Sequence, residues 1–246
     1  MSKKNKICVI GQGYVGLPLA TQFSKYFDTL GFDIDRKRIE SLKRGIDNEN
    51  ILKKKFLNKN LKFSYKKKIL KKYNIFIIAV PTPININKKP DLTILINATK
   101  MVASFLKHRD MVIFESTVYP GATEEICIPI LKKISKLNLL TNNLKEKNFF
   151  FECGYSPERV NPGDKNKTID KITKVVSGSS NQTIKKMYYL YKFVTKAGVF
   201  KSKSIKIAEA AKIIENVQRD INIALINEFL LLFKKVNLNI RDILDV

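Results

Sequence analysis

Short apolar runs alternate with amphipathic stretches along most of this chain. The apolar runs end at Gly, Pro or polar residues, and they are KICVI (6–10), TLGFDI (29–34), NIFIIAV (74–80), DMVIFEST (110–117), NFFFECG (148–154) and KITKVVSG (171–178). Helical periodicity follows most of them, as in GLPLATQFSKYF, RKRIESLKRG, ATEEICIPILKKIS and NQTIKKMYYLYKFV. Uniformly apolar strands that alternate with helices are typical of a parallel sheet covered on both faces. The pattern therefore predicts an α/β fold.

This alternation stops near Ser204, where a long helical pattern begins. Apolar residues occupy almost every side of that helix, so we expect it to be buried. Lys212, Asn216 and Arg219 nevertheless recur at i, i+4 and i+7, which places them on one face. An interface helix whose polar residues pair with neighbours explains this stripe as well as a site that stabilises a developing negative charge.

The length and the ending of the chain indicate two regions. With 246 residues, of which 44% are hydrophobic, the chain is long enough for one α/β domain and part of another. We place the first domain at residues 1–203 and the start of a helical domain at residues 204–246. The final NIRDILDV reads as the start of another helix without a cap, which predicts a chain truncated inside its second domain.

Neither a membrane span nor a secretion signal is visible in the sequence. No run of about 18 or more uncharged apolar residues occurs, and MSKKNKICVIGQG lacks the long apolar region and cleavage site of a signal peptide. Cys8, Cys127 and Cys153 have no metal-ligand spacing. We therefore expect a cytoplasmic protein with reduced thiols, no membrane association and no bound metal.

The net charge of +24 raises the question of a nucleic-acid partner. Of the 46 basic residues, 39 are Lys, and they are spread along the whole chain among many Asn and Ile residues. A general compositional bias gives such a distribution. The densest basic segment, Ile51–Lys72, is more simply a solvated face than a polyanion site, so we expect no nucleic-acid partner.

GQGYVG places Gly11, Gly13 and Gly16 in the spacing G-x-G-x-x-G, directly after the first apolar run and at the start of a helix. In that context the glycines let the backbone approach a pyrophosphate. The helix N-terminus offers amide groups and partial positive charge. The motif predicts a dinucleotide cofactor.

The residue that follows the next apolar run favours NAD. Asp33 stands where a carboxylate accepts hydrogen bonds from the adenosine ribose and repels a 2′-phosphate. Arg36 and Arg38 follow closely, and their charge would weaken that preference.

Three further segments end strands at the edge of the sheet where ligands bind in such folds. They are Val80-Pro81-Thr82-Pro83, Glu115-Ser116-Thr117 and Ser156-Pro157-Glu158-Arg159. Taken singly, Ser116 and Thr117 are explained equally well as helix caps. Glu158 is explained equally well as a surface carboxylate paired with Lys165 or Arg159. Because all three segments converge on one edge, we expect them to belong to one site.

Several motifs together resemble a known family. They are VIGQGYVGLPLA, VPTPI followed by KPDLT, ESTVYPGATEE, GYSPERVNPGD, SGSS and KIAEAAKIIENVQRDINIALINE, in this order. The sequence is similar to the nucleotide-sugar 6-dehydrogenases of the UDP-glucose/GDP-mannose dehydrogenase family. It most resembles the branch acting on UDP-N-acetylglucosamine or UDP-N-acetylgalactosamine in capsular and O-antigen polysaccharide synthesis.

The resemblance implies an N-terminal Rossmann-like NAD-binding domain followed by a central helical dimerisation domain. The chain resembles the first and only the start of the second, and the family's C-terminal UDP-binding domain has no counterpart here. The partners implied are a UDP-sugar substrate and, in the complete protein, a second copy in a homodimer.

The resemblance also implies the site residues. Those for the cofactor NAD are Gly11, Gly13, Tyr14, Val15, Gly16, Asp33, Arg38, Pro81, Thr82, Ser116 and Thr117. Those for the substrate are Glu158, Arg159, Val160, Lys212, Asn216 and Arg219. In the family's scheme, Glu158 is the acid/base for hydrolysis, Thr117 orients water, and Lys212 with Asn216 stabilises the oxyanion.

The implied reaction oxidises carbon six of the sugar twice with two NAD molecules. A cysteine captures the aldehyde as a thiohemiacetal, and water hydrolyses the resulting thioester. Two departures matter. Pro162 replaces the second glutamate of the UDP-glucose enzymes, which argues against UDP-glucose. The Gly-Gly-x-Cys loop with the nucleophile does not occur in these residues, so we expect the chain to be inactive alone. Cys153, in an apolar strand, is expected to be inert.

Two other functions compete with this interpretation. A 3-hydroxyacid-type dehydrogenase also pairs a Rossmann domain with a Lys-x-x-x-Asn helix, here Lys212 and Asn216, and it needs no cysteine. A non-catalytic NAD-binding remnant would carry the cofactor motif without turnover. The sequence leaves open which N-acetylhexosamine epimer is the substrate.

Overall fold

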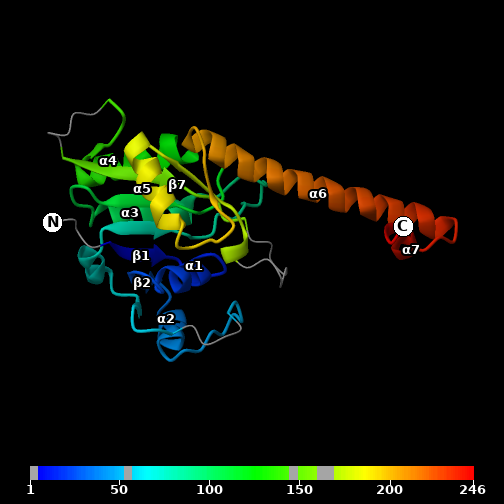
Figure 1. The fold of residues 1–246 in the computed structure, drawn as a ribbon, viewed down its shortest axis with the longest axis horizontal. Coiled ribbons are helices and arrows are strands. Elements are labelled where there is room, and N and C mark those ends of the chain that lie inside the picture. The colour runs from blue at the N-terminus through cyan, green and yellow to red at the C-terminus, as the bar shows by residue number, and fades with distance from the viewer. Residues whose placement is uncertain (1–4, 53–56, 144–148, 160–168) are drawn as a thin grey trace.

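The computed structural model describes residues 5–52, 57–143, 149–159 and 169–246. A sheet runs through the larger part of the molecule, with helices on both of its faces, and one long helix extends away from it (Figure 1). The α/β class predicted from the sequence is confirmed.

The sheet has the strand order β3-β2-β1-β4-β5-β7-β8-β9, and β6 pairs with β7. The strands are β1 (Lys6–Ile10), β2 (Asp28–Phe32), β3 (Leu61–Ser64), β4 (Ile75–Ile78), β5 (Met111–Phe114), β6 (Asn138–Leu139), β7 (Phe150–Tyr155), β8 (Lys174–Gly178) and β9 (Val199–Lys201). The strand order switches sides at β1, with β2 and β3 on one side of it and β4 and β5 on the other. The loops after β1 and β4 therefore lead away from each other and leave a crevice, which is where ligands bind in such folds.

The helices are α1 (Gly16–Phe23), α2 (Arg36–Lys43), α3 (Thr93–Ala103), α4 (Ile128–Ser135), α5 (Asn181–Tyr191), α6 (Ile205–Lys235) and α7 (Ile240–Leu244). Because side chains alternate along a strand, β1 contributes side chains to the hydrophobic cores on both faces of the sheet. Cys8 and Ile10 pack with residues of α3 and α4. Ile7 and Val9 pack with residues of α1, α2 and α5. The uniform hydrophobicity of the strands follows from this double cover.

The predicted parallel sheet has one exception among the described strands of its main path. Strand β8 runs antiparallel to β7, with Gly154 opposite Gly178 and Tyr155 opposite Ser177. Parallel neighbours need a crossover, usually a helix, whereas antiparallel neighbours do not. The sequence between these strands contains YSPERVNPGD, in which two prolines disfavour a helix.

The long helix begins where the sequence indicates. The hydroxyl of Ser204 accepts a hydrogen bond from the Ile207 amide and caps α6. Its buried residues are Ile205, Ala208, Glu209 and Lys212, all in the first turns. Beyond them the helix leaves the sheet domain (Figure 1), and its apolar side chains are exposed. Among the described helices, none is long and apolar enough to cross a membrane.

Candidate cofactor and active site

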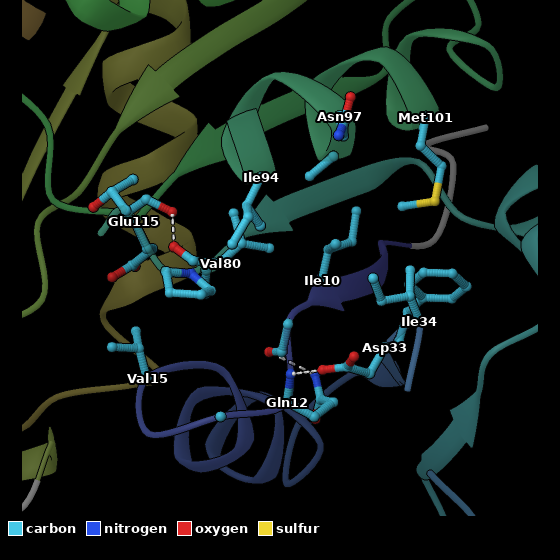
Figure 2. Close-up of a pocket in the computed structure, with 18 of the residues that line it drawn as sticks. Ile10, Gln12, Val15, Asp33, Ile34, Val80, Ile94, Asn97, Met101 and Glu115 are labelled. Carbon is cyan, nitrogen blue, oxygen red and sulfur yellow. Dashed lines mark hydrogen bonds between the residues drawn. The ribbon is translucent and has the colours of Figure 1, made fainter. Parts of the chain in front are cut away.

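A cleft of about 1310 Å³ opens at the edge where β1, β2, β4 and β5 end. Its walls include the glycine loop, the segment after β2, the loops after β4 and β5 and helix α3 (Figure 2). Glu158 of the loop after β7 and Asn216 of α6 also line it. The volume exceeds the range typical of drug-sized ligands, about 300–1,000 Å³, and suits a dinucleotide with a second molecule beside it.

The glycine loop fits a pyrophosphate. Gly11 has φ of +90°, and a Cβ there would lie 2.6 Å from the carbonyl oxygen of Ala79. A Cβ on Gly16 would overlap the carbonyl oxygen of Gly11. Gly13 has no neighbour within 4 Å of the same position, so its backbone is open to the cleft. Helix α1 follows without a side-chain cap, which leaves its first amides for an anionic ligand.

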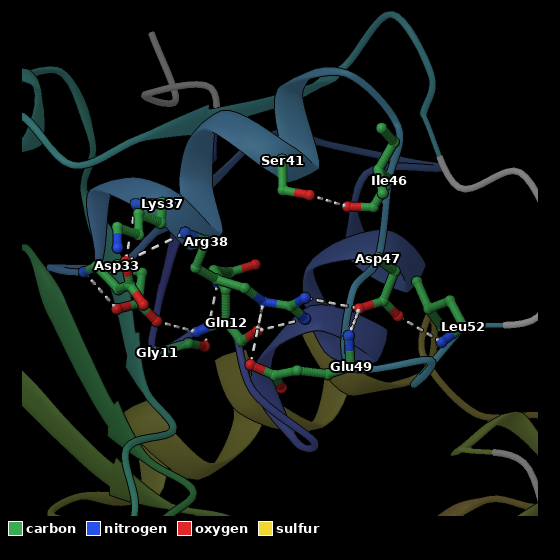
Figure 3. Close-up of polar contacts among 11 residues, drawn as sticks. Gly11, Gln12, Asp33, Lys37, Arg38, Ser41, Ile46, Asp47, Glu49 and Leu52 are labelled. Carbon is green, nitrogen blue, oxygen red and sulfur yellow. Dashed lines mark hydrogen bonds and ion pairs between the residues drawn. The ribbon is translucent and has the colours of Figure 1, made fainter.

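Asp33 stands at the rim of the cleft, directly after β2. Its Oδ2 accepts a hydrogen bond of 2.7 Å from the amide of Gln12, and its Oδ1 accepts one of 3.0 Å from the amide of Asp35. The carboxylate is thereby fixed beside the glycine loop (Figure 3), at the position where an acidic residue hydrogen-bonds the ribose of NAD in such folds.

Arg38 hydrogen-bonds the backbone of the glycine loop. Its Nε and Nη2 donate to the carbonyl oxygen of Gln12 at 3.1 and 3.0 Å. Its Nη1 forms an ion pair of 2.7 Å with Asp47, and both side chains are almost fully buried. Arg36 lies over the ring of Tyr65, 5.6 Å from its centroid. The guanidinium of Arg38 is therefore already paired, and its charge is balanced next to the predicted cofactor site (Figure 3).

The loops after β4 and β5 are tied together. The hydroxyl of Ser116 donates to the carbonyl oxygen of Val80, and that of Thr82 donates to the carbonyl oxygen of Thr117, each at 2.6 Å. These bonds replace the helix-capping role that the sequence allowed for Ser116. Pro81, Thr82, Ser116 and Thr117 all line the cleft, and their role in binding the cofactor stays a prediction.

The helix start after this loop is capped by α6 instead. Both carboxylate oxygens of Glu209, a fully buried side chain, accept hydrogen bonds from amides. Oε2 accepts from Gly121 at 2.6 Å and Oε1 accepts from Thr123 at 3.0 Å. The first turns of α6 are thus fixed to the edge of the cleft.

Glu158 reaches the cleft from the loop after β7. Its Oε1 accepts from the amide of Arg159 at 2.7 Å, and its Oε2 lies 3.3 Å from Nζ of Lys174. Its side chain is only 8% exposed, so it is not a surface carboxylate. Lys165, one of the partners considered from sequence, and Val160 lie outside the described residues.

Lys212 and Asn216 extend from α6 toward Glu158. Asn216 lines the cleft, and Lys212 is buried beside it. Burial lowers the pKa of Lys212 and the charge of Arg219 adds to this, against the opposing effects of Glu215 and Glu158. Within the described parts of the chain, the ammonium group of Lys212 forms no hydrogen bond or ion pair.

Two further predicted substrate residues, Arg159 of the loop after β7 and Arg219 of α6, meet at Glu215 of α6. Nε of Arg159 lies 2.9 Å from the carboxylate of Glu215, and Nη2 of Arg219 lies 3.6 Å from it. The stripe seen in the sequence therefore has two parts. Arg219 lies near Glu215, whereas Asn216 lines the cleft and Lys212, one turn earlier, is buried.

The structure adds residues that sequence reasoning missed. One wall of the cleft comes from α3, with Ile94, Asn97 and Met101. The segment was not predicted as a helix, although TILINATKMVA has apolar residues at helical spacing. Sequence reasoning also missed Lys174 and Tyr191, two fully buried side chains that lie behind Glu158.

None of the cysteines is placed to act as a nucleophile. Cys8, Cys127 and Cys153 are free and buried. Burial raises the pKa of Cys153 well above its ordinary value, which disfavours the thiolate.

The chain matches two parts of one family. Residues 5–195 match "UDP-glucose/GDP-mannose dehydrogenase family, NAD binding domain" and residues 206–246 match the central domain of the same family. NAD, the cofactor predicted from the sequence, is therefore confirmed as the expected one.

Named relatives agree with this match. The chain is 46% identical to UDP-N-acetyl-D-glucosamine 6-dehydrogenase of Pseudomonas aeruginosa, over 98% of this chain and 56% of that protein. It is 34% identical to UDP-N-acetyl-D-mannosamine dehydrogenase of Methanocaldococcus jannaschii, over 98% and 54%. The structure of UDP-D-ManNAc dehydrogenase from Pyrococcus horikoshii superposes with a TM-score of 0.84 at 32% identity, over 98% and 56%. The chain thus spans about half the length of these relatives.

Proposed function

The chain belongs to the UDP-glucose/GDP-mannose dehydrogenase family, and on that premise we propose the reaction of the protein that carries it. That protein oxidises the carbon-six hydroxyl of a UDP-N-acetylhexosamine to a uronic acid in two successive steps, for the synthesis of surface polysaccharide. The higher identity to a glucosamine enzyme than to a mannosamine enzyme favours a UDP-N-acetylglucosamine-type substrate.

One observation carries this proposal. The cleft runs without interruption from the glycine loop and Asp33 to Glu158 and Asn216, and the buried Lys212 lies one helical turn before Asn216. A cofactor held at one end meets at the other an acid/base, an amide and a cation. These are the groups that an alcohol oxidation followed by hydrolysis requires.

Each residue then has a role. NAD, when bound, supplies the acceptor for the hydride that leaves carbon six. Lys212 and Asn216 stabilise the oxygen that becomes negative, and Thr117 orients the water for hydrolysis. Glu158 accepts a proton from that water as it attacks the thioester and delivers it to the departing thiolate of the cysteine nucleophile that the proposed reaction requires. Pro81, Thr82 and Ser116 shape the wall against which the cofactor packs, and Asp33 binds the ribose.

We also propose that α6 mediates homodimerisation. Its exposed apolar side chains continue far beyond the docked turns, for example Ile214 at 67%, Ile221 at 60% and Leu231 at 59%. Exposed apolar surface of this extent marks an interface. The helical region from residue 204 is then a domain of its own. We place the protein in the cytoplasm, in keeping with its free thiols.

The test uses the product of the complete reading frame. It is incubated with NAD and, separately, with UDP-N-acetylglucosamine, UDP-N-acetylgalactosamine, UDP-N-acetylmannosamine and UDP-glucose. Two NADH per sugar and a carboxylate product support the proposal. One NADH from a small 3-hydroxyacid, with no reaction on UDP-sugars, supports the competing dehydrogenase. Cofactor binding without turnover on either class supports the remnant.

A further inference from the structure

A lysine is fully buried behind the cleft. Lys174 is the first residue of β8, and its side chain has no exposed surface. Removing an ammonium group from water costs several kcal/mol even after the protein has relaxed around it. Such a residue persists only where partners compensate the charge, so its partners indicate its purpose.

Three acceptors surround the ammonium group. Nζ of Lys174 lies 2.7 Å from Oε2 of Glu115, 3.3 Å from Oε2 of Glu158 and 3.3 Å from the carbonyl oxygen of Pro157. An ammonium group has three hydrogens, so all of them are used. Its position is therefore fixed by β5 on one side and by the loop after β7 on the other.

The network continues away from the cleft into α5. The hydroxyl of Tyr191 donates to Oε1 of Glu115, and the ring of Tyr191 lies 5.5 Å from Nζ of Lys174. Glu115 is thus held by two donors and is itself buried. A continuous chain of contacts runs from Tyr191 through Glu115 and Lys174 to Glu158.

A purely stabilising role explains this arrangement poorly. Apolar groups of similar volume are often as stabilising as a buried ion pair, or more so. Here the cation joins two carboxylates from different segments, and both carboxylates line the cleft. A structural pair would need only one of them.

We propose that Lys174 is a positioning residue, whose buried ammonium group holds the Glu158 carboxylate ionised and oriented at the cleft. This inference rests on the proposed function, because it assigns to Glu158 a role in proton transfer. Glu158 contacts the cleft directly, whereas Lys174 acts through it.

The electrostatics agree with the geometry. Burial by itself lowers the pKa of Lys174, but the carboxylates of Glu115 and Glu158 outweigh it and the net shift is upward. Burial raises the pKa of Glu115 to about 7, although the charge of Lys174 opposes this. Lys174 is therefore a permanent cation near neutral pH.

The groups that face Glu158 come from several elements. Among the described residues they are Tyr14 of the glycine loop, Glu115 after β5, Arg159 of the loop after β7, Lys174 of β8, Tyr191 of α5 and Lys212 of α6. Without Lys174, two carboxyl groups would share a buried site, and one of them would take a proton. Loss of the opposite charge beside Glu158 would itself raise the pKa of that carboxyl and favour its neutral form.

The test measures the titration of Glu158 in this chain by NMR of ¹³C-labelled glutamate side chains. The Glu158 signal is assigned with E158Q. In K174M we expect its titration midpoint to rise by about 1 to 3 pH units, the effect of removing an adjacent opposite charge. K174R, which keeps the cation, should restore most of the wild-type midpoint.

Two control variants test whether the Glu158 midpoint depends on the position of the Lys174 charge or only on the overall charge of the protein. K171M removes an exposed lysine three residues earlier and should leave the Glu158 midpoint unchanged. Y191F removes the hydroxyl bound to Glu115 and should shift Glu115 while leaving Glu158 in place. A folded K174M with an unchanged Glu158 midpoint overturns the inference.

If K174M does not fold, E115Q/K174M is compared with E115Q, since it removes the cation together with the buried charge that the cation balances. An unchanged midpoint there, or a double variant that also fails to fold, overturns the inference and leaves Lys174 a purely structural role. The readout needs no sugar substrate. A wild-type protein that binds no UDP-sugar therefore defeats the proposed function, whereas the NMR result reports on Lys174 alone.

Discussion

The two ends of helix α6 have similar apolar sequences and opposite surroundings. In the first turns, Ile205 and Ala208 are buried against the sheet domain, and Glu209 caps the loop after β5. Farther along, Val217 is 50% exposed and Leu225 is also 50% exposed. An apolar pattern predicts that a surface is covered, but it does not identify what covers it. The first turns of α6, its docked end, are covered by the sheet domain, whereas the rest of the helix, its free end, is exposed.

The largest expected effect tests whether the docked end belongs to the active site. Replacing Lys212 by Ala should reduce turnover of the complete protein by roughly a hundredfold or more, the scale for losing one oxyanion donor. Lys206 is the matched control, because it lies on the same helix and its ammonium group pairs with Glu125 at the surface. Lys206→Ala should leave turnover nearly unchanged. Equal effects from both substitutions would remove Lys212 from the site.

A smaller effect is expected on the stability of the docked end. Glu209→Ala leaves the buried amides of Gly121 and Thr123 without an acceptor. We expect the free energy of unfolding to fall by about 2 kcal/mol, measured by urea denaturation. Glu228→Ala, at an exposed position on the free end, should stay within about 0.5 kcal/mol of wild type. If Glu209→Ala has no larger effect than this control, the cap does not fix the helix.

Because the carboxyl group of Glu115 is buried, the free energy of unfolding should depend on pH. The pKa of Glu115 is raised from 4.5 to about 7 in the folded state. Its contribution to stability is therefore complete below about 4.5 and is lost as the pH rises toward 7. The slope is at most about 1.4 kcal/mol per pH unit. Urea denaturation across this window should show the decline in wild type and a flatter profile in Glu115→Gln. Parallel profiles would contradict the assignment.

Much of the fold was readable from the sequence because local patterns and tertiary cover agree there. Strand β1 coincides with KICVI, and α6 starts at the Ser204 cap. Strand β3 was missed because LKFS is short and lies among lysines. Strands β6 and β9, of two and three residues, carry too little pattern to detect. The antiparallel β8 depends on a connection that strand hydrophobicity does not encode.

The site was predictable where a motif has its own backbone requirement. The glycine loop and Asp33 meet at the cleft because strand ends in a parallel sheet share one edge. The role of Lys174 could not be predicted, because nothing in the sequence distinguishes a buried lysine from the others among the 39. Glu209 likewise looks like any acidic residue on a helix. Their roles arise from tertiary contacts alone.

The smallest effect on the folded domain is expected at the free end of α6. Ile221→Glu with Leu225→Glu should abolish self-association, because both side chains belong to the exposed apolar surface. The unfolding free energy of the monomeric chain should change by no more than about 0.5 kcal/mol. Sedimentation velocity compares this variant with Lys235→Glu, which alters charge at an exposed position on the same helix. A wild-type chain that stays monomeric at high concentration would contradict the proposed interface.

The most direct test of the central claim, that the cleft is an NAD site ending at Asp33, is calorimetric titration of the chain with NAD and with NADP. The account predicts tighter binding of NAD, because the fixed carboxylate of Asp33 accepts from the ribose and repels a 2′-phosphate. The paired guanidinium of Arg38 offers that phosphate no free cation. In Asp33→Asn the difference between the two cofactors should shrink. Equal or tighter binding of NADP by the wild-type chain would contradict the account.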